Sequence, residues 1–321
     1  MDAPTTIKLA DLPSDPFEAR SIVLNKTGGW ALEKSAKYIQ EQYSNYAMLE
    51  YAVDFFDQDL LDAAPSDGNS FIKLGLFPWA EAASELEKVL SLTMLSLYKN
   101  SFDSMRRALE LVVVGAFFIL DSIETEKARA WLKSNKSTPN FKRAIEKLVK
   151  DEPYLSCEHQ CKFSEFILDI YYRLSDYVHV KGMEKSHRRL TPSSHHINDV
   201  ACLMFHESSC KQSLDLFIET SQAISLVCVL TIPRLLVGFD LESKFGLNPP
   251  LSVFFAHNQS ERLYFLIPER FRLFVDELEK NDEGIRSVKE WFDSMPDISE
   301  EEFSQQCKEV SELYNVKSEN N

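Results

Sequence analysis

The segment Leu109–Leu120, LELVVVGAFFIL, decides the fold class of this chain of 321 residues. Its side chains are apolar all round a helical wheel, as expected for a helix that other helices surround. Ala223–Ile232 is a second run of this kind. The uncharged parts, Leu111–Leu120 and Ala223–Ile232, have ten residues each. A bilayer requires ~20, and Glu110, Asp121 and Arg234 bound these parts closely. Both runs are therefore predicted to be buried core helices.

The composition outside these two runs also favours helices. Hydrophobic residues make up 44% of the chain, and there are only 9 glycines, which tight hairpins and phosphate loops need. We predict an all-α protein, a multi-helix bundle around long buried helices, with a small, mostly helical C-terminal subdomain. The predicted divisions are an N-terminal lead-in and helix (1–66), a helical core (67–240) and the C-terminal subdomain (241–321).

Apolar residues recur at steps of three and four along most of the chain. The predicted helices cover about 31–61, 79–123 with a break near 99–101, 125–134, 140–150, 157–180, 198–239 with a kink or break before Pro233, 268–280, 282–294 and 299–313. Residues 1–30 contain Pro16 and Gly28–Gly29 and are predicted to be an extended lead-in. Only LSVFFAH (251–257) and RLYFLI (262–267) resemble strands.

The charge and the cysteine pattern bear on location and partners. The net charge of −15 argues against broad binding to nucleic acid or to an anionic membrane, but it allows a small basic site. The N-terminus lacks the basic start and apolar run of a signal peptide. Six cysteines without paired spacing indicate reduced thiols. We expect a cytoplasmic protein without a membrane span.

A polar stripe runs along the helix predicted at 157–180. Tyr172, Ser175, Asp176 and His179 follow helical spacing on the side away from the apolar face. The stripe is either a solvated surface or a site in which a hydroxyl and a carboxylate orient the His179 ring. A basic segment follows at once, and its cations suit phosphate contacts, unless it is an ordinary charged loop. These cations are Lys181, Lys185, Arg188 and Arg189.

The run YYRLSDYVHVKG, Tyr171–Gly182, resembles the Ser-x-x-Val-His signature of helical bacterial proteins related to the HEPN superfamily. An earlier helix with Arg106-x-x-x-Glu110 in an apolar setting is similar to the same group. The resemblance implies a helical bundle that dimerises. It also implies metal-independent ribonuclease activity, often in stress or defence systems such as toxin–antitoxin pairs, with Arg173 and His179 as the Arg-x4–6-His pair.

The helical wheel places Arg173 and His179 about 120° apart. A homodimer could bring the second group from the other subunit, or Arg188 or Arg189 could replace Arg173. An active site of this kind would cleave RNA through the neighbouring 2′-hydroxyl, with His179 as general acid or base and an arginine stabilising the charged transition state. No metal or other cofactor would be required.

Arg106 and Glu110 are four residues apart on one helix face, inside a stretch that becomes wholly apolar. Their spacing predicts a structural ion pair between buried helices. The alternative is that Arg106 or Arg107 faces a cleft together with His179.

Histidines and cysteines concentrate between Cys157 and Cys210. Cys202, His206 and Cys210 follow steps of four, so they lie close to one helical face and are weak candidates for a zinc site. Paired Cys-x2-Cys spacing is missing, and unligated cysteine commonly behaves as a small buried hydrophobe.

The sequence contains no GxGxxG, P-loop, HExxH or GxSxG motif. The leading hypothesis is therefore a HEPN-like helical protein that binds or cleaves RNA. The alternatives are a non-catalytic scaffold that acts through a dimer surface, and a helical protein with structural zinc.

Overall fold

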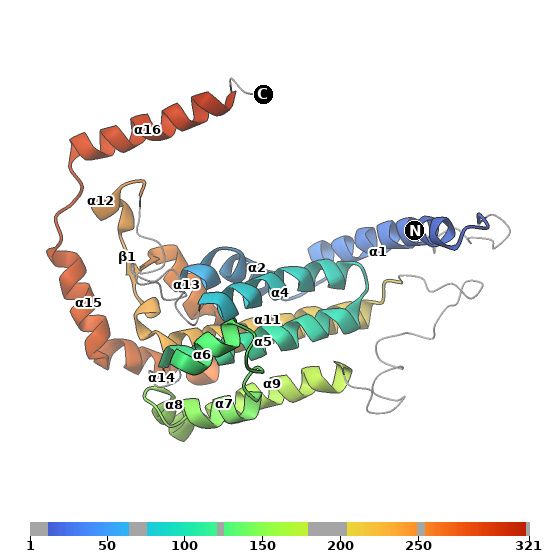
Figure 1. The fold of residues 1–321 in the computed structure, drawn as a ribbon, viewed down its shortest axis with the longest axis horizontal. Coiled ribbons are helices and arrows are strands. Elements are labelled where there is room, and N and C mark those ends of the chain that lie inside the picture. The colour runs from blue at the N-terminus through green and yellow to red at the C-terminus, as the bar shows by residue number, and fades with distance from the viewer. Residues whose placement is uncertain (1–11, 64–75, 121–124, 179–203, 249–253, 319–321) are drawn as a thin grey trace.

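The computed structural model describes residues 12–63, 76–120, 125–178, 204–248 and 254–318. These residues form an all-α protein, as predicted, with one two-residue strand pair (Figure 1). The helices of the N-terminal and central parts are α1 Pro16–Glu41, α2 Tyr46–Asp54, the π-helical turn η2 Phe55–Asp59, α3 Leu60–Ala63, α4 Leu76–Met94, α5 Tyr98–Leu120, α6 Thr125–Leu132, α7 Phe141–Leu148, α8 Tyr154–Cys161, α9 Phe163–Val178 and α11 Glu207–Thr231.

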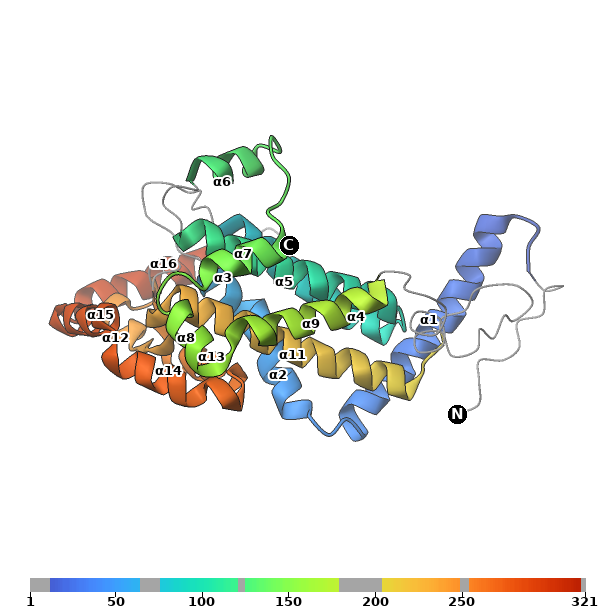
Figure 2. The ribbon, with the colours of Figure 1, turned by 90° about the horizontal axis from the view of Figure 1, so that it is seen from below.

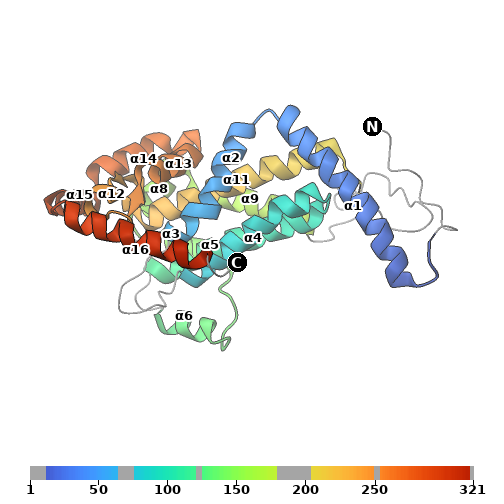
Figure 3. The same cartoon turned by 90° about the horizontal axis from the view of Figure 1, so that it is seen from above.

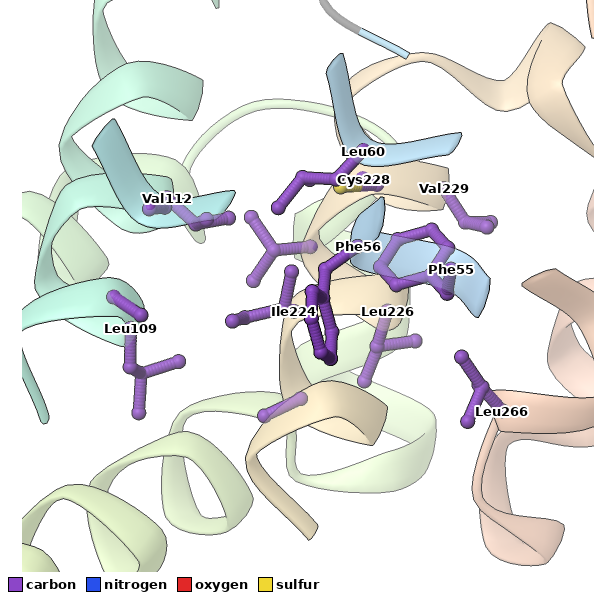
Figure 4. Close-up of a cluster of buried hydrophobic side chains, with 14 of the residues drawn as sticks. Phe55, Phe56, Leu60, Leu109, Val112, Ile224, Leu226, Cys228, Val229 and Leu266 are labelled. Carbon is purple, nitrogen blue, oxygen red and sulfur yellow. The ribbon is translucent and has the colours of Figure 1, made fainter. Parts of the chain in front are cut away.

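Four long helices, α4, α5, α9 and α11, lie side by side and contain half of the buried hydrophobic residues (Figures 1 and 2). The two apolar runs fall on α5 and α11, and the side chains from Val112 to Phe118 are all buried. The core continues into η2, whose Phe55 and Phe56 lie beside Ile224 of α11 (Figure 4). The prediction of two buried core helices is confirmed.

Among the described helices, α11 is the one that is long and apolar enough to cross a membrane. However, 83% of its most apolar window is buried inside the protein. Such burial is typical of the central helix of a soluble protein. The chain ends this helix at Thr231, two residues before Pro233, which begins the short 3-10 helix η4 Pro233–Leu236. The predicted break before Pro233 is therefore confirmed.

The break between α4 and α5 lies at Leu95–Leu97, a few residues before the predicted position. Ser96 has a left-handed backbone, with φ of 61°. The Ser96 N–H donates to Thr93 O, and the Leu97 N–H donates to Leu92 O, which together close the end of α4. Across this turn, the buried hydroxyls of Thr93, Ser101 and Ser213 lie 2.7–2.9 Å from one another and join α4, α5 and α11.

The predicted extended lead-in is wrong for the described residues from Pro16 onward, because α1 begins there. The Asp15 carboxylate accepts hydrogen bonds from the Phe17 and Glu18 N–H groups, and Pro16 occupies the first turn, where a missing N–H does no harm. Gly28 is a buried position inside this helix. The same proline that suggested an irregular segment is therefore part of a helix start.

The helix predicted at 157–180 is two helices, α8 and α9. Lys162 between them has a left-handed backbone, with φ of 59°, which ends α8. The Glu158 carboxylate then accepts hydrogen bonds from the Ser164 N–H and hydroxyl at 2.7 Å, and so caps α9. The start predicted near 198 for the next long helix is also wrong, because residues 204–206 are not helical and α11 begins at Glu207.

The C-terminal part contains β1 Gly238–Phe239, α12 Leu241–Phe245, β2 Phe255–Ala256, α13 His257–Leu266, α14 Glu269–Asn281, α15 Glu283–Ser294 and α16 Glu300–Ser318. The two strands pair in parallel, with Gly238 opposite Phe255. RLYFLI is not a strand, because it continues α13 and buries Leu263 and Leu266 on one helical face. Of the predicted strand at 251–257, the structure describes residues 254–257. Within them, Phe255 and Ala256 form a strand, β2.

A buried ion pair joins the C-terminal part to η2. Arg262 of α13 donates two hydrogen bonds of 2.7 and 2.8 Å to Asp59, whose side chain is fully buried. Two helices lie at the periphery instead. Helix α6 stands away from the bundle in both turned views, and α16 runs along the outside of the C-terminal part (Figures 2 and 3).

Candidate functional site

A polar groove of about 560 Å³ lies between α9 and the N-terminal half of α11. Both helices turn charged or hydrogen-bonding side chains into it, although each is otherwise mostly apolar. The lining residues are Arg173, Tyr177, His206, Ser208, Lys211, Gln212, Asp215, Leu216 and Glu219. We call this feature the α9–α11 groove.

Arg173 lies in the groove between two carboxylates. Its guanidinium forms a two-pronged ion pair with Glu219 of α11, with Nη1 at 3.3 Å from Oε1, and its Nε lies 3.0 Å from Asp169 Oδ2 on α9. The hydrogen bond to Glu219 raises the pKa of Arg173 above its ordinary value, against the opposing effect of burial. Arg173 is therefore a fixed cation whose charge is balanced within the groove.

His206 is the residue immediately before α11, and its ring lines the same groove as Arg173. The hydroxyls of Ser208 and Ser209 lie 3.0 and 3.2 Å from Nδ1, so the ring orientation is held by the first turn of α11. The backbone is held too, because the His206 N–H donates to Tyr98 Oη at 3.2 Å. An imidazole with one ring nitrogen held in this way suits proton transfer at the other.

The remaining polar groups tie the groove to the bundle. Gln212 donates to the hydroxyl of Tyr177, which joins α11 to α9. Lys211 lies 2.6 Å from Asp215, which also accepts a 3.0 Å hydrogen bond from Tyr43. Burial, followed by the neighbouring Asp215 charge, raises the pKa of Tyr43, so this phenol stays neutral and acts as a donor. The groove thus contains two cations and two carboxylates in fixed pairs.

The predicted polar stripe on α9 is only partly exposed. Tyr172 is 49% exposed and Asp176 is half-buried, but Ser175 is 5% exposed and belongs to the interior. The correction has a simple cause: α9 contacts α5, α7 and α11, so more than its apolar face is covered. His179, Lys181, Lys185, Arg188 and Arg189 lie outside the described residues. The last described residue of α9 is Val178.

Arg106 and Glu110 form the predicted ion pair, with 3.0 Å between Nη2 and Oε1. Arg106 also donates to the hydroxyl of Tyr171 on α9 at 3.1 Å, and its guanidinium lies over the Tyr171 ring. Neither residue lines the α9–α11 groove. The neighbouring Arg107 is directed to Glu85 of α4, 3.1 Å away. The structural interpretation of Arg106 therefore has direct support in these contacts.

The three zinc candidates do not form a site among the described residues. Cys202 lies outside them, and His206 faces the groove. Cys210 is fully buried, and burial raises the pKa of its thiol to about 12, which disfavours the thiolate that zinc requires. No cluster of three potential ligands occurs in the part of the chain that the structure describes.

Comparisons with protein-family models, with curated proteins and with solved structures found no match to this chain. Function therefore has to be argued from the residues themselves.

From the sequence, His206 is predicted only as a candidate metal ligand, and its neighbours on α11 are not predicted as site residues. A signal for them exists, since Lys211, Asp215 and Glu219 follow steps of four on a helix that is otherwise rich in apolar residues. A charged stripe on a core helix indicates a groove at its surface. What could not be foreseen is that Glu219 pairs with Arg173, because that contact joins two distant segments.

Proposed function

We propose that this protein is a HEPN-like RNA-binding protein that cleaves RNA without a metal, and that the α9–α11 groove is its active site. One observation carries the proposal: Arg173 and His206 line the same groove. A cation and an imidazole in one cavity are the groups that phosphodiester cleavage through the 2′-hydroxyl needs. The HEPN resemblance centres on the same stretch of α9.

The proposed reaction transfers two protons. One imidazole accepts the proton of the ribose 2′-hydroxyl as its oxygen attacks the adjacent phosphorus. The bond from phosphorus to the 5′-oxygen breaks, and a second, protonated imidazole donates a proton to that oxygen. The products are a 2′,3′-cyclic phosphate and a 5′-hydroxyl. His206 and His179 are the proposed pair, and Arg173 stabilises the additional negative charge on the phosphate oxygens.

The pairing of Arg173 sets a condition on this mechanism. Glu219 and Asp169 occupy the guanidinium, so a phosphate must exchange with at least one carboxylate to reach it. Arg173 is 40% exposed in its side chain, which leaves an approach from solvent. The resemblance adds that the protein works as a homodimer in a bacterial stress or defence system, and we include this in the proposal together with the cytoplasmic location that the cysteine pattern indicates.

The proposal is tested by cleavage of labelled single-stranded and structured RNA in EDTA. The intact protein is compared with His179→Ala and with His257→Ala, which removes an imidazole from α13, outside the groove. We expect cleavage by the intact protein and by His257→Ala, with products that end in a cyclic phosphate, and a loss of at least about 100-fold in His179→Ala. Absence of cleavage, or equal cleavage by all three proteins, contradicts a catalytic role.

A non-catalytic scaffold is the second candidate, and one observation favours it. Arg173 is neutralised by its two carboxylates, as a purely structural arginine would be. The most exposed large apolar side chains also lie away from the groove, at Phe17 of α1 (82%) and Leu273 of α14 (80%). In that case the intact protein does not cut RNA, but it forms a stable dimer in sedimentation experiments.

A further inference from the structure

The strongest local excess of positive charge among the described residues lies on α6, α7 and the loop between them. Segment 128–150 contains seven lysines and arginines and a single acid, Glu146, in a chain whose net charge is −15. All seven basic side chains are exposed, and they make up what we call the basic face. They are Arg129, Lys133, Lys136, Lys142, Arg143, Lys147 and Lys150.

Helix α7 explains why these cations remain at the surface. Its apolar side chains, among them Phe141 and Ile145, are buried against the bundle, while Lys142, Arg143 and Lys147 point outward. Because the apolar face is already occupied, α7 cannot insert into a lipid surface as an amphipathic anchor would. The basic face is therefore suited to a partner that approaches from solvent and carries negative charge.

An apolar pocket of about 320 Å³ opens within the basic face. Aromatic rings form much of its wall, and Phe118 and Trp131 are in tilted contact with ring centroids 5.6 Å apart. Trp131 is fixed by a 3.1 Å hydrogen bond from Nε1 to the Thr138 hydroxyl. Lys147 lies over the Phe117 ring, 4.8 Å from its centroid. Among the residues that the structure describes, the lining contains three cations and no carboxylate: Phe117, Phe118, Trp131, Lys136, Ser137, Pro139, Asn140, Arg143, Ala144 and Lys147.

The combination of an aromatic pocket and an extended row of cations selects the class of ligand. A small amphiphilic anion needs one cation beside an apolar hole, whereas seven cations spread over α6, α7 and the adjoining loops match a chain of regularly spaced negative charges. A chain that also carries flat aromatic groups is a single-stranded nucleic acid, in which bases stack on aromatic side chains and phosphates meet lysine and arginine.

We propose that the basic face binds single-stranded RNA, with one base held in the pocket beside Trp131 and the flanking phosphates held by Lys136, Arg143 and Lys147. This inference rests on the proposed function, since it assigns the surface that brings the substrate to the α9–α11 groove. Helix α7 lies beside α9 (Figure 2), and the Phe141 ring stacks on Tyr171 with centroids 4.1 Å apart. Tyr171 and Arg173 both belong to α9, on different sides of the helix.

A second apolar pocket provides an internal contrast. It lies where α1, α2 and α4 meet, and its charged lining residues are the acids Glu50 and Asp54. Those carboxylates repel a phosphate chain, so pocket shape alone does not direct RNA to it. The difference in charge, rather than in apolar character, distinguishes the two pockets as RNA sites.

The test is a binding titration that cannot be confused with cleavage. Fluorescence anisotropy follows a labelled 2′-O-methyl oligouridylate, which lacks the attacking hydroxyl, at several salt concentrations in EDTA. We expect Arg143→Glu/Lys147→Glu to weaken binding at least tenfold and to lower the slope of log K against log salt by about 1.4, or about 0.7 for each lost phosphate contact. Lys308→Glu, a control on α16, keeps the intact affinity and slope.

Trp131 tests the aromatic part separately. Trp131→Ala is expected to weaken binding of the oligouridylate about tenfold. It should leave binding of an abasic phosphodiester of equal length unchanged. Trp131→Phe, which keeps a ring in the pocket, should retain most of the affinity, and this guards against a general loss of folding in the alanine variant.

The outcomes separate this inference from the proposed function. Binding that depends on the basic face, without cleavage of ordinary RNA, supports the inference and contradicts only the catalytic proposal. Failure of the intact protein to bind RNA, equal binding by the charge-reversed variant, or binding to anionic vesicles in place of RNA overturns the inference. If Trp131→Ala loses affinity for the oligouridylate and for the abasic phosphodiester equally, the pocket does not bind a base.

Discussion

The α9–α11 groove and the basic face handle their charges in opposite ways. In the groove, Arg173 is paired with Asp169 and Glu219, and Lys211 is paired with Asp215. On the basic face, seven cations share a segment with one acid, Glu146, which lies 4.0 Å from Lys142. Ion pairs therefore hold the charged side chains of the groove in fixed positions. The basic face instead carries a net positive charge, which attracts anions over a longer distance.

This contrast indicates a division of labour between the two regions. Cations whose field is cancelled by neighbouring carboxylates attract a polyanion weakly, whereas a segment with a clear excess of cations over acids attracts it over about a Debye length. Fixed pairs, by comparison, hold side chains in the positions that proton transfer requires. Changes to the proton-transferring imidazole of the groove should therefore affect the rate of chemistry, and changes on the basic face should affect affinity.

The largest effect is expected from His206→Ala. If its imidazole transfers a proton, the rate of RNA cleavage in EDTA should fall by about 100-fold or more, while RNA affinity changes less than about twofold. Ser208→Ala is the matched change beside it, because it removes one of the two hydroxyls near Nδ1 and should lower the rate only a few-fold. A cleavage rate that survives in His206→Ala removes this residue from the mechanism.

An intermediate effect, of opposite sign, is expected from Glu219→Gln. Removal of this carboxylate leaves Arg173 with Asp169 as its remaining described ion-pair partner and makes its guanidinium available to a phosphate. At about 0.1 M salt, one additional phosphate contact should tighten RNA binding about fivefold. Glu207→Gln removes the same charge from the exposed first turn of α11 and serves as the control. Equal RNA affinity of the intact protein, Glu219→Gln and Glu207→Gln would show that the Arg173–Glu219 ion pair does not limit phosphate binding in the groove.

The sequence predicted the all-α fold because Leu109–Leu120 and Ala223–Ile232 are apolar on every side, a property that needs no knowledge of distant contacts. Predictions from local sequence were wrong where the same residue type is compatible with two kinds of secondary structure. Pro16 suggested an irregular segment but begins α1, and the run RLYFLI suggested a strand but continues α13.

The candidate site was less predictable for a physical reason. Ser175 is buried because α9 contacts three other helices, and a helical wheel shows only one apolar face. The pairing of Arg173 with Glu219 joins residues 46 positions apart, so no spacing rule reveals it. The basic face is different, since a count of charges over 128–150 shows it in the sequence alone.

The smallest effect concerns the contact between the two regions. Arg106 bridges Glu110 and Tyr171, and Tyr171 in turn stacks on Phe141 of α7. Arg106→Ala leaves partly buried groups without this donor and should cost about 1–2 kcal/mol, or a few degrees in Tm. Arg107→Ala changes a side chain that is 51% exposed, and it should cost about 0.5 kcal/mol. Equal melting curves for Arg106→Ala and the intact protein would contradict a structural role.

The most direct test of the division of labour is single-turnover cleavage of RNA in EDTA over a range of protein concentrations. The comparison includes the intact protein, His206→Ala and Arg143→Glu/Lys147→Glu. We expect His206→Ala to lower the rate at saturation and keep the half-saturating concentration, and the charge-reversed variant to raise the half-saturating concentration and keep the rate at saturation. If both variants change the same parameter, or if the intact protein does not cleave, the account is contradicted.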